Sequence, residues 1–269
     1  MSSKSFFSQL IPLLLTVVLF IILSLFIYIE IALLNHFSHS DIVLKLLWQD
    51  ILIGMTIYLK TSVDFALFIG NLMSRFAGMR NRIAIELGTA VGNALGTMLI
   101  LMVWIFFRNV NWLLAIMIIV AALVLLRLAE DSFEHVDNNE IAGFFARNLK
   151  KINHFFNPLL NKIIPNISMK SDSKKLGFVS LFGFAFTVPF ILGLDDFAGY
   201  VPLFNIVHVF GFAIGVLLGH MVLNIFLFLS PQKTIRVVKN STISIIGGIA
   251  FILLAVWGLH EAILLLINP

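Results

Sequence analysis

Residues 205–229 read NIVHVFGFAIGVLLGHMVLNIFLFL and contain no Asp, Glu, Lys or Arg. As a helix, this run is long enough to cross the hydrocarbon core of a bilayer, which needs about 20 apolar residues. Gly211, Gly215 and Gly219 recur at every fourth position and therefore share one helical face. Small residues on one face let another backbone approach closely in lipid. The run predicts a membrane-spanning helix with one face suited to close packing.

Further apolar runs of this kind occupy most of the chain. Hydrophobic residues make up 60% of the 269 residues and charged residues 12%, which excludes a water-soluble globule. The runs lack the alternating pattern of a transmembrane barrel, so the spans should be helices. The predicted fold class is an all-α integral membrane protein with seven transmembrane helices, at 8–35, 50–75, 83–107, 111–128, 176–200, 205–229 and 241–267. No room is left for a separate soluble catalytic domain.

The positive charges are distributed unequally between the two sides of these spans. Of the 18 Lys and Arg, only Lys45 and Arg108 lie on one side, and Lys60 lies within a span. The positive-inside rule places the N-terminus in the cytoplasm and the C-terminus outside. We expect a multi-pass protein of the plasma membrane, the inner membrane in a bacterium, whose partner is the lipid bilayer and not a nucleic acid. The absence of Cys excludes thiolate metal ligands and disulfides.

The chain contains an internal repeat. Residues 62–68 and 194–200 both hold Asp-Phe-Ala followed two residues later by an aromatic residue. The next span of each half carries a face of glycines, which are Gly88, Gly92 and Gly96 in one half and Gly211, Gly215 and Gly219 in the other. Each half therefore consists of an Asp-span, a glycine-span and a plain span. Because three is an odd number of crossings, the halves should form an inverted 3+3 repeat.

The repeat sets the predicted domain organisation. Residues 1–48 form an N-terminal transmembrane helix and an outer loop, 49–128 the first repeat, 129–175 a charged cytoplasmic connector and 176–269 the second repeat. The two glycine-spans should form the close-packed centre where the halves meet. Within the connector, an amphipathic stretch around 144–156 could rest on the anionic inner leaflet. The alternative interpretation is a flexible linker between two helical bundles.

Acidic residues within the spans are the strongest candidates for function, because a carboxylate in the membrane is costly and seldom faces lipid. Asp64 lies near the middle of its span, and Asp195 and Asp196 follow Pro189 and Gly193, where we expect the helix to break. The candidate ion-binding residues are Asp64, Asp195, Asp196, Thr61, Ser62, Asn93, His220 and Asn224, with Asp64 and Asp196 as the metal ligands. The oxygen ligands suit a hard divalent cation, and His220 would favour a transition metal. The alternative is that the aspartates are structural caps at the membrane interface.

Other charges within the spans leave two interpretations open. Lys60 precedes Asp64 by one helical turn, so the two could form an ion pair that couples ion binding to charge movement. Alternatively, Lys60 snorkels to the outer interface. Glu30, Glu86 and Glu261 lie nearer the ends of their spans, and we expect them to snorkel or to cap helix ends. The sequence indicates no resident cofactor, and a homo-oligomer remains open.

The segment Tyr58-Leu59-Lys60-Thr61-Ser62-Val63-Asp64, followed by Gly88-x-x-x-Gly92, resembles the cadmium-resistance transporter family of the lysine-exporter superfamily. The resemblance covers roughly 48–268 and is closest over 55–100. It implies a six-helix core, a substrate site shared by the acidic motifs of both halves, and export of a cation. By position, Asp64, Asp195 and Asp196 would be the ligands. This chain differs from the family in its extra N-terminal helix, in Lys60 and in its long charged connector.

These observations favour a secondary transporter, not an enzyme, that exports a small cation by alternating access around carboxylates in the middle of the membrane. A divalent metal such as cadmium, manganese, zinc or calcium is the expected substrate. One alternative is an intramembrane aspartyl protease, but Gly193-Leu194-Asp195-Asp196 departs from the Gly-x-Gly-Asp pattern of such enzymes. Another is a membrane scaffold or assembly factor, in which the aspartates would be dispensable.

Overall fold

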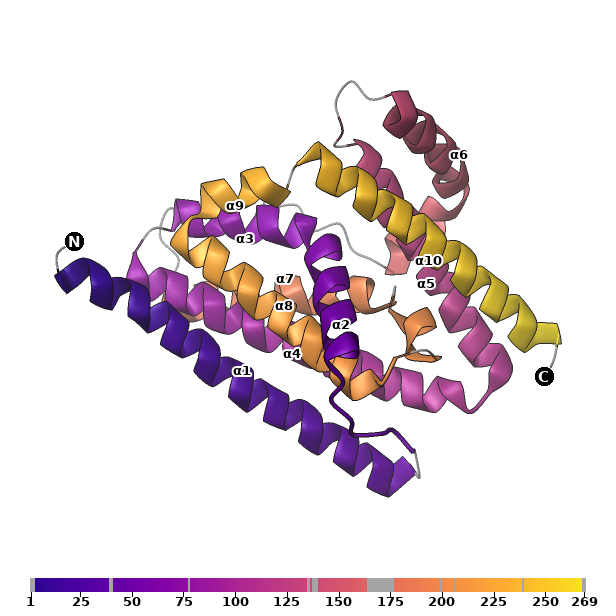
Figure 1. Ribbon diagram of the computed structural model, residues 1–269, viewed down its shortest axis with the longest axis horizontal. Helices are drawn as coiled ribbons and strands as arrows, with labels where there is room; N and C mark the ends of the chain where they lie inside the picture. The colour runs from indigo at the N-terminus through magenta and orange to yellow at the C-terminus, as the bar shows by residue number, and fades with distance from the viewer. Residues whose placement is uncertain are drawn as a thin grey trace. The chain divides into compact units, whose positions relative to one another are not determined.

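The structure is a computed structural model of the chain. It describes residues 3–38, 41–76, 78–134, 136, 140–163, 177–198, 200–205, 207–238 and 240–267. The regular elements in these ranges are all helical (Figure 1). They are α1 (Ser3–Ser38), α2 (Trp48–Thr61), α3 (Val63–Arg75), α4 (Met79–Arg108), α5 (Asn111–Glu134), α6 (Glu140–Ile163), α7 (Phe178–Ala198), η1 (Val201–Asn205), α8 (Val209–Leu229), α9 (Pro231–Val238) and α10 (Ser241–Ile267).

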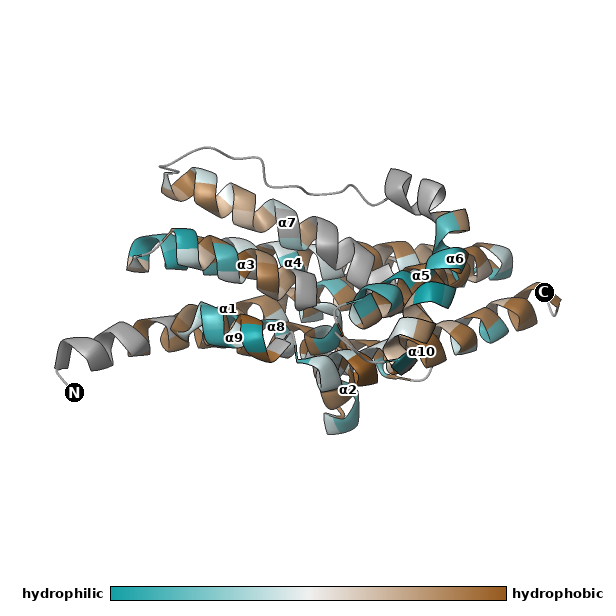
Figure 2. Cartoon of the chain, turned by 90° about the horizontal axis from the view of Figure 1, so that it is seen from above, coloured by the Kyte–Doolittle hydropathy of each residue, from teal (hydrophilic) through white to brown (hydrophobic). Residues whose placement is uncertain are grey.

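The helices confirm the all-α membrane class. In the described part of the chain, five helices are long and apolar enough to cross a membrane, and α2 with α3 makes a sixth span if the bent pair counts as one. The remaining predicted span, 176–200, forms α7. Within α7, Phe178–Thr187 is apolar but is shorter than a full membrane span. Figure 2 shows hydrophobic residues along most of α10 and many hydrophilic ones on α6.

The break in the backbone is not at the predicted place. The helix α7 continues through Pro189 to Ala198, so the break expected at Pro189 and Gly193 is wrong. Membrane helices tolerate an internal proline when neighbouring groups satisfy the freed backbone. Instead, the first Asp-span bends by 66° between α2 and α3, at Ser62 (Figure 1). Neither glycine nor proline stands at the bend.

The chain divides into two compact units that do not coincide with the sequence repeats. The first unit comprises residues 1–99, 169–193 and 207–237, and the second comprises 100–168, 194–206 and 238–269. Each unit therefore combines elements from both predicted repeats. Within each unit, spans of one repeat pack against spans of the other.

In the first unit, α2 packs along α8 through the second glycine face. A Cβ atom at Gly215 would overlap the backbone of Ile51, and one at Gly219 would lie 3.0 Å from the Tyr58 ring. Gly54 on α2 likewise faces the Phe212 carbonyl of α8. Residue numbers rise together along this contact, so the two helices run parallel. Parallel packing requires both helices to cross in the same direction, as the second and sixth predicted spans do.

The first glycine face makes the equivalent contact with the other Asp-span. A Cβ atom at Gly88 would press on the Phe182 carbonyl of α7, and one at Gly92 would overlap that of Phe186. Gly96 is buried too. Each glycine-span thus packs, in parallel, against the Asp-span of the opposite repeat rather than against the other glycine-span. Each predicted repeat therefore contributes its glycine-span to a contact with the Asp-span of the other.

The helix α1 contributes one narrow stripe to the first unit. Its buried residues are Thr16, Leu19, Leu23, Ile27 and Ile31. The apolar side chains on its other faces are exposed, as expected of a helix that faces lipid. Tyr28 on α1 meets Phe210 at the start of α8, with ring centroids 6.0 Å apart. The extra N-terminal helix is therefore packed against the core elements.

In the second unit, the two plain spans pack on each other. Ser244, Gly248, Ala255 and Ala262 form a buried stripe of small residues along α10. At Gly248, near the start of α10, a Cβ atom would lie 2.7 Å from the ring of Phe133, near the end of α5. The helices therefore run antiparallel, consistent with crossings in opposite directions. The sequence did not predict this stripe, because its small residues are serine, glycine and alanine and not glycine at every fourth position.

Candidate functional site

A stripe of buried polar residues runs along α4 in the first unit. Glu86, Thr89, Asn93 and Thr97 are each at most 4% exposed. Their spacing of three and four residues places them on one helical face, next to the glycine face that contacts α7. Thr97 donates to the Asn93 carbonyl at 3.0 Å, and Thr89 donates to the Glu86 carbonyl at 3.0 Å. In a membrane bundle, such a polar stripe has to find its partners inside the protein.

His220 on α8 connects this stripe to α2. Its side chain is fully buried. Its Nδ1 lies 2.6 Å from the Tyr58 hydroxyl, and its Nε2 lies 3.0 Å from Nδ2 of Asn224. Tyr58 and His220 therefore share one hydrogen bond at Nδ1, and His220 and Asn224 share another at Nε2. Both ring nitrogens are engaged, so coordination of a metal by His220 would require Tyr58 or Asn224 to move.

The chain of hydrogen bonds continues from α8 to α4. Nδ2 of Asn224 also donates to the Thr89 hydroxyl at 3.0 Å. We call Tyr58, Glu86, Thr89, His220 and Asn224 the polar cluster. Its members come from α2, α4 and α8, so both repeats contribute to it. The two glycine-spans meet at the hydrogen bond between Asn224 and Thr89, but their glycines lie against α7 and α2, so the prediction that the glycine-spans together form the close-packed centre is wrong.

Glu86 joins the polar cluster through its backbone carbonyl, which accepts from Thr89. It is fully buried, and its Oε1 accepts a hydrogen bond from the Thr16 hydroxyl of α1. The expectation that Glu86 snorkels or caps a helix end is therefore wrong. The cause is α1, which covers the position that would otherwise lie open near the start of α4. The N-terminal helix thereby contributes a side chain to the interior of the unit.

The break between α2 and α3 lies beside the polar cluster. Thr61 and Ser62 are both buried, and the Tyr58 carbonyl accepts from the Thr61 hydroxyl at 3.1 Å and from the Ser62 amide at 2.9 Å. Immediately after the break, the ring of Phe65 lies 5.2 Å from that of His220. Lys60 is half-buried in the last turn of α2. The buried hydroxyl groups of Thr61 and Ser62 therefore lie at the break, within one turn of Tyr58.

The predicted acidic ligands fall outside what can be described. The side chains of Asp64, Asp195 and Asp196 lie outside the described residues. Their backbone positions are in α3 for Asp64 and in α7 for the other two. Among the described residues, no group of three or more His, Asp or Glu side chains could hold a metal ion.

Several polar atoms near this region lack partners within the described part of the chain. They are Oε2 of Glu86, Oδ1 of Asn224, Nδ2 of Asn93 and Oγ of Ser62, all buried. A buried polar group without a hydrogen bond is costly, and each such group calls for an explanation. Three of the four atoms are oxygens. The arrangement can accept a cation, a proton or ordered water at these oxygens.

Sequence reasoning missed a second buried acid. Asp50, in the first turn of α2, is 5% exposed and lies 3.0 Å from Nδ1 of His208, the residue before α8. Gly211 leaves room for it, because a Cβ atom there would lie 3.0 Å from that of Asp50. The pair joins the starts of α2 and α8. The sequence signal for this pair was an acidic residue at the start of one apolar run and a histidine near the start of another.

The sequence also contained a signal for Glu86 and one for Tyr58 as members of the polar cluster. Glu86 continues the spacing of Thr89 and Asn93 by one further turn toward the N-terminus. Tyr58 lies on the same side of α2 as Thr61, three residues away. A search of known proteins adds no further residue to this set. The chain matches no protein-family model, no curated protein and no solved structure.

Proposed function

We propose that the protein is a secondary transporter that exports a small cation, with a divalent metal as the substrate class. The observation that carries the proposal is the break at Ser62 in a membrane span, next to a buried polar cluster built from both repeats. Non-helical backbone at membrane depth is tolerated where it is buried in protein or lines a cavity. Broken helices in repeated membrane folds supply ion ligands of this kind.

The packing of the repeats supports alternating access. Each Asp-span lies against the glycine-span of the opposite repeat, at Gly92 and at Gly215. Glycine faces of this kind let two helix backbones approach closely, so each repeat contributes its glycine-span to a close contact with the other repeat. The two halves then rock around a site that stays in place. Export, rather than import, rests only on the resemblance to the cadmium-resistance family. The choice of a divalent metal rests on that resemblance and on the acidic motifs.

In this proposal, Asp64 and Asp196 ligate the ion and Asp195 assists them. The hydroxyls of Thr61 and Ser62 and the side-chain oxygens of Asn93 and Asn224 supply further ligands, which suits a hard divalent cation. Lys60 pairs with Asp64 when no ion is bound and is displaced when the ion arrives. The polar cluster joins α2, α4 and α8 beside the break at Ser62, with His220 as its central hydrogen-bonding group.

The proposal is tested by transport into proteoliposomes across a panel of divalent metals. Asp64→Asn and Asp196→Asn should each lower the initial rate by at least about tenfold, because losing a charged ligand costs about 1.5–3 kcal/mol and 1.4 kcal/mol is a factor of ten. Asp41→Asn, the same change at an exposed residue, is the matched control and should leave the rate unchanged.

Other outcomes distinguish the competing interpretations. Equal rates for wild type, Asp64→Asn and Asp196→Asn across the whole panel would refute a cation site at these aspartates and favour a scaffold. Cleavage of a membrane-embedded peptide that is lost with Asp196→Asn would favour a protease. Protein yield and melting temperature are measured for every variant, so that a folding defect is not mistaken for a lost ligand.

A further inference from the structure

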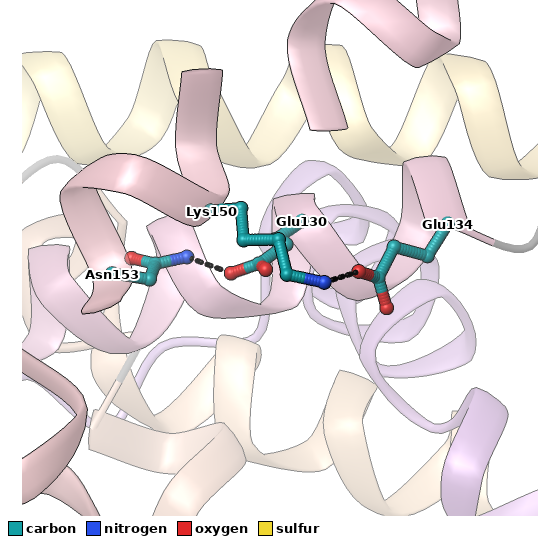
Figure 3. A network of polar contacts seen from close by, with 4 residues as sticks. All are labelled: Glu130, Glu134, Lys150 and Asn153. Carbon is teal, nitrogen blue, oxygen red and sulfur yellow. Dashed lines mark hydrogen bonds and ion pairs between the residues drawn. The ribbon is translucent and has the colours of Figure 1, made fainter. Parts of the chain in front are cut away.

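The connector helix α6 docks on α5 through one face. Ala142, Leu149 and Asn153 on this face are buried. Nδ2 of Asn153 donates to Oε2 of Glu130 at 2.5 Å and to the Leu126 carbonyl at 3.2 Å (Figure 3). A fully buried asparagine bonded to a buried carboxylate fixes the rotation of α6 about its axis. The residues on the opposite face are consequently held outward.

The position of α6 along α5 follows from a series of contacts. They run in opposite directions along the two helices, with Phe145 on Phe133, Asn153 on Glu130 and Leu126, and Phe156 on Leu123 and Val124. The predicted span in α5 is 111–128. The middle of α6 therefore lies level with the charged end of α5, where headgroups begin. Its later part, at Phe156, lies level with the apolar span.

The outward face of α6 combines cations with large apolar side chains. An open groove of about 550 Å³ is lined by Phe144, Arg147, Asn148, Lys150, Lys151 and His154. Phe155 is 79% exposed and Phe144 58% exposed. Lys150 is held 3.2 Å from Glu134 (Figure 3), while Arg147 and Lys151 are exposed beside it. Along α6 the cations Arg147 and Lys151 are followed by the exposed Phe155, and this order matches the change from headgroup to acyl chain in a leaflet.

We propose that this face of α6 binds the phosphate of an anionic phospholipid, on the side of the membrane that the charge distribution assigns to the cytoplasm. Arg147 and Lys151 contact the headgroup phosphate, and Phe155 lies among the acyl chains. A soluble anion would use the cations but would gain nothing from the phenylalanines. The chemistry of the face therefore favours a lipid over free phosphate. The inference does not depend on what the protein transports.

The test uses the full-length protein and counts bound lipids by native mass spectrometry, with phosphatidylglycerol and phosphatidylcholine as probes. Wild type should hold phosphatidylglycerol more tightly. The double variant Arg147→Gln/Lys151→Gln should weaken this binding by about fivefold for each cation removed. The matched control is Lys233→Gln/Arg236→Gln on α9, which removes the same charge from two exposed residues and should leave the binding unchanged.

Three results would overturn the proposal. One is equal binding of the two lipids by wild type, and another is an equal loss in the α6 and α9 variants, which would indicate a non-specific effect of net charge. The third is complete displacement of phosphatidylglycerol by inorganic phosphate, which would identify a soluble anion as the ligand. Phe155→Ser provides an independent variant. It should weaken phosphatidylglycerol binding while leaving the binding of soluble glycerophosphoglycerol unchanged, and an unchanged lipid affinity would refute the acyl contact.

Discussion

Glu86 is the residue whose environment is most unlike its sequence context. It lies in the second turn after the last basic residues of its segment, where an acid normally meets water. Yet its carboxyl is fully buried, with one oxygen accepting from Thr16 and the other without a partner among the described residues. An ionisable group buried in a membrane bundle is a functional candidate by default. Under the proposed function, Glu86 joins the candidate residues as a group that would bind a cation or a proton during transport.

Glu86→Gln keeps the size of the side chain and removes its ionisable group. Transport should fall by at least about tenfold, because a hydrogen bond or ion contact to a charged group contributes about 1.5–3 kcal/mol. Initial rates in proteoliposomes measure this. Glu261→Gln on α10, a half-exposed position, is the control and should transport normally. If Glu86→Gln transported at the wild-type rate, Glu86 would have a structural role only.

Among the elements, the glycine-spans determine how closely the helices approach. Gly215 lies against the backbone of Ile51, so even a methyl group would separate α8 from α2. Gly183, by contrast, is also a helical glycine of the first unit, but a Cβ atom there would meet nothing within 4 Å. The two positions therefore separate the effect of crowding from the effect of glycine on helix propensity.

Gly215→Ala should lower the free energy of unfolding by about 1–3 kcal/mol, the usual cost of overpacking a tight contact. Gly183→Ala should leave stability unchanged or raise it by up to about 1 kcal/mol, because alanine is the better helix former. Unfolding in mild detergent, followed by circular dichroism, measures both. Equal stability of Gly215→Ala and wild type would contradict the packing of α2 on α8.

For the whole molecule, the relative directions of the helices agree with an alternating path through the membrane. Within the first unit, α2 and α8 run parallel, and so do α4 and α7. Within the second unit, α5 and α10 run antiparallel. An alternating seven-span path produces these directions, whichever side the N-terminus occupies. The distribution of Lys and Arg predicts the orientation with the N-terminus inside.

The orientation is tested by cysteine labelling, which has no background because the chain contains no cysteine. Asp41→Cys should react with a membrane-impermeant maleimide in intact cells, because it lies in the predicted outer loop. Gln232→Cys, an exposed residue of α9, should react only after permeabilisation. Labelling of Gln232→Cys alone in intact cells would reverse the orientation and would move α6 to the outer leaflet.

The membrane class, the approximate spans and the glycine faces could be predicted because each depends on residues close together in the chain. Hydropathy over about 20 residues and a period of four residues are local properties. The Asp-Phe-Ala repeat also indicated which spans correspond to each other. The same local rules misplaced the helix break, because Pro189 and Gly193 are strong local signals and Ser62 is a weak one.

Which residues make up the candidate site depends on contacts between distant parts of the chain. Only the folded structure shows these contacts. Thr16 meets Glu86 across 70 positions of sequence, and Tyr58 meets His220 across 162. No local pattern indicates which helix will cover a carboxyl near a span end or which glycine face will receive α2. The amino-acid order alone establishes that the chain crosses the membrane and carries polar groups within it. Folding establishes which of those groups touch, because burial in a helical bundle depends on the packing of neighbours that are distant in the chain.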